Sequence, residues 1–393
     1  MKLVIHRPEE KIRLVVISFS LFVALMLFQT SYMRLGTLTA SATLLMTIGT
    51  YFLQGKGLRG RLSLNRASAC LLMFLVYSVM LTLLKGMRPS GFVRYIAQII
   101  MCLLLFSVEL NQREHDYLKK VFSAAATVYA VLIIQSYSAN SRAGYYHQDV
   151  LLFNTAFDPN FIGIPLIAAT VLLLDNVLNQ RKWKLSVVMY TINVAAIVYT
   201  ASRGSFVALV CSNLLLVALF LLKRNLRVGR KFLYLLIPVM VTLVLVQYLS
   251  MLFPTEWERV TSIDVGDGTG RLKLWRTALQ DWWRAPVLGN GLGYAYAAHL
   301  KATHNTYLQV LSETGLLGFG LATAFVFPML RKALKRDAVL FCMSIGVLVQ
   351  ITFLDAVDNR CLWILMSWVA MLPQEREGTL VYEKTFETVY TKI

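Results

Sequence analysis

The sequence predicts an all-α, polytopic membrane protein of about twelve transmembrane helices. Three observations lead to this prediction: 57% of the 393 residues are hydrophobic, only 15% are charged, and apolar runs of spanning length recur along the whole chain. A soluble globular domain carries roughly a quarter charged residues, so this composition excludes an ordinary soluble enzyme. Because about 20 apolar residues cross the hydrocarbon core of a bilayer as a helix, each run is expected to form one span.

No repeat of fixed period and no low-complexity linker divides these runs. Residues 1–373 are therefore predicted to form a single integral membrane domain, followed by a short cytoplasmic tail at 374–393. The expected spans are 13–30, 35–53, 67–84, 92–110, 121–138, 160–178, 184–201, 205–222, 232–253, 306–330, 338–354 and 359–373.

The distribution of basic residues predicts the orientation in the membrane. The net charge is +18, and Lys and Arg cluster on every second connection. Cytoplasmic loops carry such an excess, and charge of this kind anchors a protein at the bilayer, so we expect no nucleic-acid partner. Both termini are then cytoplasmic, and the connections 138–159, 200–204 and 254–305 are external. The basic clusters lie at 56–66, 113–120, 181–184, 223–231 and 331–336.

The external loop 254–305 is the only sizeable hydrophilic segment, and loops of this length usually have a function of their own. Within it, residues 270–284 alternate apolar and basic positions at helical spacing, which predicts an amphipathic helix at the outer membrane–water interface. A helix that only covers the end of the bundle has the same pattern. The apolar positions are Leu272, Trp275, Leu279 and Trp282, and the basic ones are Arg271, Lys273, Arg276 and Arg284.

A second group of polar residues opens the span that follows this loop. His304 and Asn305 lie at its external mouth, and Glu313 lies about two turns deeper. An ionisable group in this position is costly to bury without a partner, so His304 is a candidate functional residue. Asn305 either orients the imidazole or caps the helix. His299, earlier in the loop, is expected to be dispensable.

Two short external connections carry further candidates. Arg203 lies in a turn too short to leave the membrane surface, and it either extends to lipid phosphate or projects into a cavity. Asp158 and Asn160 either cap the helix at 160–178 or line the same cavity. The alternating glycines of 289–293 lack the GxGxxG spacing and are expected to form a flexible turn rather than a nucleotide site.

Five short segments occur in an order that is more specific than any one of them. They are Ser202-Arg203-Gly204, Gly270-Arg271, Pro286 with Gly289, Gly291 and Gly293, His304-Asn305-x-Tyr307-Leu308, and Glu313-x-Gly315-Leu316-Leu317-Gly318. With the predicted topology, this arrangement resembles the O-antigen ligase and polymerase family of bacterial envelopes. The resemblance is strongest over 155–320.

The resemblance implies a bundle of the GT-C glycosyltransferase type, and a donor glycan carried on undecaprenyl diphosphate without a nucleotide sugar. Transfer would take place on the outer face of the bacterial cytoplasmic membrane. Carried over by position, Arg203 and Arg271 would bind the donor diphosphate, and His304 would assist the acceptor. The expected supporting residues are Asn305, Tyr307, Asp158, Asn160, Glu313 and Arg276.

This chemistry suits the residues. Departure of a diphosphate requires neutralisation of its growing charge, which two guanidinium groups can provide through paired hydrogen bonds. A neutral histidine can accept the proton of a sugar hydroxyl. No set of Asp, Glu and His in the external segments has metal-ligand spacing, so we expect inverting transfer by direct displacement without a metal or another cofactor.

Several functions remain open at this point. An O-antigen or capsular polysaccharide polymerase is favoured, because the external connections offer no large patch for a lipid A–core acceptor. The alternative is a ligase that joins the finished polymer to lipid A–core. A flippase for lipid-linked oligosaccharides would need polar residues through the bilayer and repeated spans. A peptidoglycan polymerase of the shape–elongation–division type would need a loop carboxylate, which must be Asp264, Asp267 or Asp281.

Overall fold

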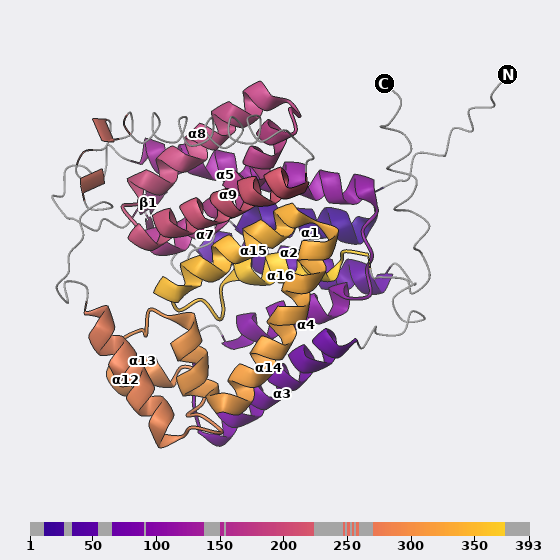
Figure 1. Cartoon of the computed structure of the whole chain (residues 1–393). Helices are drawn as coiled ribbons and strands as arrows, with labels where there is room; N and C mark the ends of the chain where they lie inside the picture. Colours follow the sequence, from indigo (N-terminus) through magenta and orange to yellow (C-terminus); the bar gives the residue numbers. More distant parts are fainter. Residues whose placement is uncertain are drawn as a thin grey trace.

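The computed structural model describes residues 12–26, 34–53, 65–89, 92–136, 150–152, 155–223 and 270–373, with a few isolated positions between 247 and 258. This part of the chain is helical apart from one short ribbon, and its long helices form a bundle with a smaller helical segment at one end (Figure 1). The predicted tail at 374–393 and the predicted span at 232–253, but for three of its positions, lie outside the described residues.

The other predicted spans are all found as helices at the expected places. Five of them, α3, α5, α7, α9 and α14, are long and apolar enough to cross a membrane, which supports an integral membrane protein. The total of twelve spans stays a prediction. The helices are α1 (Leu14–Met26), α2 (Arg34–Leu53), α3 (Arg66–Leu84), α4 (Phe92–Leu105), α5 (Gln112–Gln135), α7 (Pro159–Leu178), α8 (Trp183–Tyr199), α9 (Arg203–Lys223), α14 (Thr306–Arg336), α15 (Ala338–Gln350) and α16 (Arg360–Ala370).

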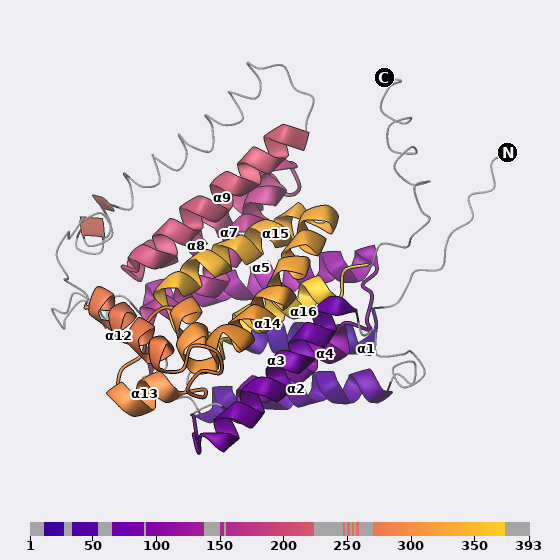
Figure 2. The ribbon, with the colours of Figure 1, turned by 60° about the horizontal axis from the view of Figure 1, so that its bottom comes forward.

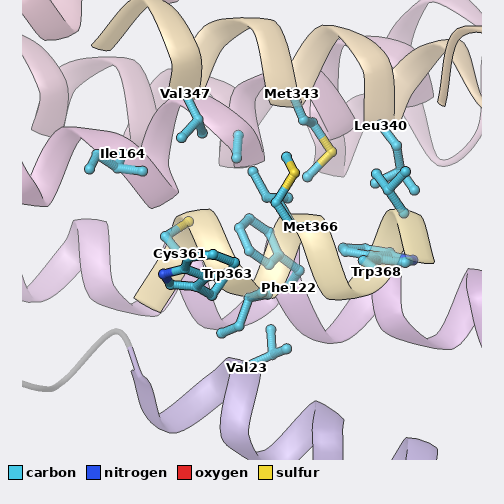
Figure 3. Packing of buried hydrophobic residues seen from close by; sticks show 14 of the residues in the cluster. Val23, Phe122, Ile164, Leu340, Met343, Val347, Cys361, Trp363, Met366 and Trp368 are labelled. Atoms are coloured by element: carbon cyan, nitrogen blue, oxygen red, sulfur yellow. The ribbon is translucent and has the colours of Figure 1, made fainter. Parts of the chain in front are cut away.

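Helix α7 lies at the centre of its half of the bundle, where it packs against α5, α8, α9 and α15. Almost every residue from Ile162 to Leu174 is buried, as the unbroken apolar sequence requires. Helix α16 is short but equally buried: its side chains, Trp363 and Trp368 among them, fill the space between α15 on one side and α5 and α1 on the other (Figure 3). These contacts hold the ends of α7, α15 and α16 in fixed relative positions.

The connection before α7 contains a small antiparallel ribbon that the sequence did not predict. Strand β1 (Val150–Leu152) pairs with β2 (Thr155–Phe157), with Leu151 opposite Ala156. Each strand has three residues, which is too short for a period of two to stand out against the surrounding loop.

Two more helices precede α14 in the chain, α12 (Arg271–Arg284) and α13 (Tyr294–His299). Helix α12 confirms the amphipathic helix predicted at 270–284. Figure 2 shows α12 and α13 together at one end of the bundle, and α12 packs against α14. Its position at the membrane–water interface stays a prediction.

Helix α14 is broken at Gly315, which has a φ of 63°. The loop from Pro286 to Gly291 enters this break and bonds to the freed backbone. The amide of Leu316 donates to the carbonyl of Pro286 at 2.9 Å, and that of Gly291 donates to the carbonyl of Glu313 at 2.8 Å. Non-helical backbone inside the bundle is tolerated because the loop satisfies its polar groups. The glycines therefore allow a close backbone approach, as expected for a turn.

Candidate active site

Arg203 is placed by a tight turn between α8 and α9. Ala201 adopts a left-handed conformation with a φ of 50°, and Arg203 then begins α9. The turn is fixed by hydrogen bonds to α7: the hydroxyl of Ser202 donates to Oδ1 of Asn160 at 2.9 Å. Gln350, at the end of α15, donates from Nε2 to the carbonyl of Asn160 at 3.0 Å and to Oγ of Ser205 at 2.9 Å. Three helix ends are thus joined by buried polar contacts beside Arg203.

Asp158 lies at the same end of the bundle as the N-cap of α7. Its Oδ1 accepts hydrogen bonds from the backbone and side-chain nitrogens of Asn160, at 2.8 and 3.0 Å. The expected capping role of Asp158 is confirmed, and Asn160 is buried between this cap and Ser202.

Arg203, Arg271 and Asp158 come together although they lie far apart in the sequence. Burial lowers the pKa of the Arg271 guanidinium, the positive charge of Arg203 lowers it further, and the negative charge of Asp158 opposes both effects. Arg203 and Arg271 also stand at the first positions of α9 and α12, where helix N-termini attract anions. Two guanidinium groups and two helix N-termini therefore lie in one region with the carboxylate of Asp158.

Phe353, which sequence reasoning missed, separates the two arginine-bearing segments. The guanidinium carbon of Arg271 lies 5.8 Å from the centroid of its ring. A Cβ atom at Gly204 would lie 2.8 Å from Cδ2 of Phe353, so only glycine fits beside Arg203 at this point. An isolated phenylalanine at the end of an apolar span gives no sequence signal for such a role.

His304 lies just before α14 and has a φ of 52°, which is unusual for a residue with a side chain. The carboxylate of Asp355 holds this conformation, since it accepts hydrogen bonds from the amides of Thr303, His304 and Asn305. The bond from Asn305 measures 3.1 Å. Burial raises the pKa of Asp355, and these amide hydrogen bonds act in the opposite direction. Sequence reasoning also missed Asp355.

Asn305 and Tyr307 stabilise the start of α14. Oδ1 of Asn305 accepts a hydrogen bond from the amide of Leu308 at 3.1 Å, so this side chain caps the helix. The hydroxyl of Tyr307 donates to the carbonyl of Leu348 on α15 at 2.8 Å. Both contacts fix the mouth of α14 next to His304.

Glu313 is fully buried, and its carboxylate is used by the loop that enters α14. It accepts hydrogen bonds from the amides of Gly293 and Ala295 and from Nε2 of Gln309, the last at 3.4 Å. Glu313 therefore connects the broken helix to the start of α13. Arg276, by contrast, is exposed on α12.

The arginine pair and His304 belong to one region, because Phe353 and Asp355 are only two residues apart. Their Cα atoms lie at most about 7 Å from each other. Phe353 contacts Arg271, and Asp355 holds the backbone of His304. The segment after α15 therefore joins the two halves of the candidate site.

His299, which the sequence predicts to be dispensable for activity, pairs with a carboxylate of α12. Its Nε2 lies 2.7 Å from Oδ2 of Asp281, a carboxylate that is only 2% exposed. Arg284 lies 3.4 Å from the other oxygen of the same carboxylate. The pair joins α12 to α13, so His299 has a structural partner, and Asp281 is engaged in the fold. Asp264 and Asp267, the other loop carboxylates, lie outside the described residues.

Within the part of the chain that the structure describes, no group of three or more His, Cys, Asp or Glu side chains could hold a metal ion. Metal-independent transfer stays a prediction.

Residues 185–323 match the O-antigen ligase family. The match confirms the resemblance stated from the sequence, and it includes Arg203, Arg271 and His304. No curated protein matches the chain. The O-antigen ligase family region covers α8, α9, α12 and α13 and the first part of α14, so the candidate site lies largely within it.

Proposed function

We propose that this protein is a membrane glycosyltransferase that moves a glycan from undecaprenyl diphosphate to a sugar hydroxyl on the outer face of the cytoplasmic membrane. One observation carries the proposal: Arg203 and Arg271 begin two different helices and lie near enough for the charge of one to act on the guanidinium of the other, beside Asp158. Two partly buried guanidinium groups at helix N-termini suit a lipid-linked diphosphate.

The reaction we propose is a single displacement at the anomeric carbon. The acceptor hydroxyl oxygen forms a bond to this carbon while the bond from the carbon to the diphosphate oxygen breaks, and the diphosphate leaves with the electron pair. Arg203 and Arg271 stabilise the charge that develops on it. The proton of the hydroxyl passes to His304, which Asp355 holds at the mouth of α14.

Of the activities that fit this chemistry, we propose an O-antigen or capsular polysaccharide polymerase, in which the acceptor is itself a lipid-linked glycan. A ligase that transfers the polymer to lipid A–core is the second candidate, and the description of the matching family as O-antigen ligase favours it. Both activities use the same donor, so the donor site serves either.

The donor site is tested by replacing each arginine with lysine. An ammonium group cannot make the forked contacts of a guanidinium, so Arg203→Lys and Arg271→Lys should each lower the transfer rate at least about tenfold. The assay is glycan transfer from the purified undecaprenyl-diphosphate donor in detergent, where no flipping step is needed. Arg88→Lys is the control, because Arg88 is an exposed arginine in the turn between α3 and α4. Full activity of both variants would contradict the proposed donor site.

A further inference from the structure

A second pair of arginines lies at the first turns of α4 and α16, outside the region of the family match. Arg94 forms an ion pair with Asp358, with side chains that are 30% and 38% exposed. The guanidinium of Arg360 lies near both side chains: the positive charge of Arg94 repels it, and the negative charge of Asp358 attracts it. Two guanidinium groups and one carboxylate thus lie near one another at the starts of α4 and α16.

Two buried polar groups beside this pair lack a partner among the described residues. Gln98 lies one turn below Arg94 on the same side of α4, its side chain is fully buried, and neither its amide oxygen nor its amide nitrogen is hydrogen-bonded. Nε of Arg94 is buried and unbonded as well. Buried polar groups are almost always satisfied by protein, water or ligand, so an unsatisfied amide and an unsatisfied guanidinium nitrogen one turn apart indicate a place for a polar ligand.

The pair is close to His304 along the chain segment that follows α15. Asp355 holds the amide of His304, and Arg360 follows five residues later, so their Cα atoms are at most about 18 Å apart. Phe353, in the same segment, contacts Arg271. This segment therefore passes from the first arginine pair, past His304, to the second.

We propose that Arg94 and Arg360 bind the phosphate groups of the acceptor, so that both substrates of this protein are phosphorylated lipids. The inference rests on the proposed function, because it assigns the second substrate of the same site. With the donor diphosphate at Arg203 and Arg271, an acceptor held at Arg94 and Arg360 brings its sugar to His304 between the two pairs. Two similar pairs of arginines suit two lipids that both carry phosphate groups.

A phosphorylated acceptor has two sources, which are an undecaprenyl-diphosphate-linked glycan and a lipid A whose sugars carry phosphate. The first source makes the protein a polymerase, and the second makes it a ligase. The shared feature is a phosphate group at the membrane surface, for which the arginine fork is well suited.

The experiment counts lipids bound to the purified protein in nanodiscs by native mass spectrometry, with undecaprenyl diphosphate and bisphosphorylated lipid A as separate probes. We expect the wild type to bind two phosphorylated lipids: two undecaprenyl diphosphates in a polymerase, or one of each in a ligase. Arg360→Gln should remove one of them and weaken its binding at least about tenfold, and it leaves the ion pair of Arg94 with Asp358 intact. Arg88→Gln, an exposed arginine close in sequence, should bind as the wild type does.

The outcomes separate this inference from the proposed function. If the wild type binds only one phosphorylated lipid, and only Arg203→Lys or Arg271→Lys weakens it, the second site is wrong and the donor site stands. If Arg360→Gln binds both lipids as tightly as the wild type, the second site is equally wrong. If Arg203→Lys and Arg271→Lys bind both lipids and transfer glycan as the wild type does, the proposed donor site is wrong. The binding of lipid by Arg360→Gln then still tests the second site.

Discussion

His304 keeps an unfavourable backbone conformation because another residue holds it there. A left-handed residue with a side chain costs about 1–3 kcal/mol, and such residues persist where the surrounding structure over-determines them. The carboxylate of Asp355 accepts hydrogen bonds from three successive amides, and these bonds keep His304 in its left-handed conformation. The backbone of His304 is thereby fixed before any substrate binds, which in the proposed function favours proton transfer in a fixed geometry. Asp355 is thus a positioning residue.

The role of His304 is tested by removing its ring. His304→Ala should bind the undecaprenyl-linked donor as the wild type does but transfer it at least about a hundredfold more slowly, since a general base contributes about 10²–10⁴-fold in rate. Single-turnover transfer and donor binding are measured separately. Lys301→Ala, an exposed change in the same loop, is the control. Turnover near that of the wild type would reduce His304 to a structural residue, and the search for the base would move to Asp158 and Glu313.

At the scale of the elements, helix α14 is broken at Gly315 but is held in place by the loop 286–291, which is hydrogen-bonded to the break. The loop provides carbonyls to the amides of Leu316 and Leu317, at 2.9 and 3.1 Å, where the helix itself cannot. Side chains add to the attachment, since Nδ2 of Asn290 donates to the carbonyl of Ser312 at 2.9 Å. Because α12 precedes this loop directly, the attachment also sets the position of Arg271.

The break predicts opposite effects for two glycines of the same helix. Gly315→Ala should lower the free energy of unfolding by about 1–3 kcal/mol, because the residue has a positive φ and its Cβ would clash with the carbonyl of Val287. Gly320→Ala, five residues later, has open space around its Cβ and should raise that free energy by about 0.5–1 kcal/mol. Thermal unfolding in detergent compares the two. Equal stability of both variants would contradict the close loop insertion.

At the scale of the whole molecule, the sequence predicted what depends on composition and local spacing. Apolar runs predicted the helices, and the amphipathic pattern predicted α12. It did not predict contacts that depend on distant parts of the chain meeting. Phe353 and Asp355 follow an apolar span like many others, and the pairing of Asp281 with His299 crosses 18 residues. The contacts of Phe353 and Asp355 become visible only when the ends of α9, α12, α14 and α15 are assembled, and the pairing of Asp281 with His299 only when α12 and α13 meet.

Connections between the helices meet at both ends of the bundle. At one end of the bundle, the loop after α12 packs against the turn that follows α3, since a Cβ atom at Gly291 would meet Lys85 and Met87. At the other end, Lys119 near the start of α5 pairs with Asp337 between α14 and α15 at 2.6 Å. Among the described connections, the basic one between α14 and α15 therefore lies at the end opposite the candidate site. The positive-inside rule uses the position of such basic connections to assign the cytoplasmic face.

The orientation is therefore testable with two cysteines placed at opposite ends. In a variant without the five natural cysteines, Lys301→Cys should react with a membrane-impermeant thiol reagent in intact spheroplasts, because Lys301 is exposed next to the candidate site. Arg181→Cys, exposed in the basic connection between α7 and α8, should react only after the membrane is permeabilised. Both are surface positions, so neither change should affect folding. The reverse labelling pattern would place Arg203, Arg271 and His304 in the cytoplasm, where an external lipid-linked donor cannot reach them.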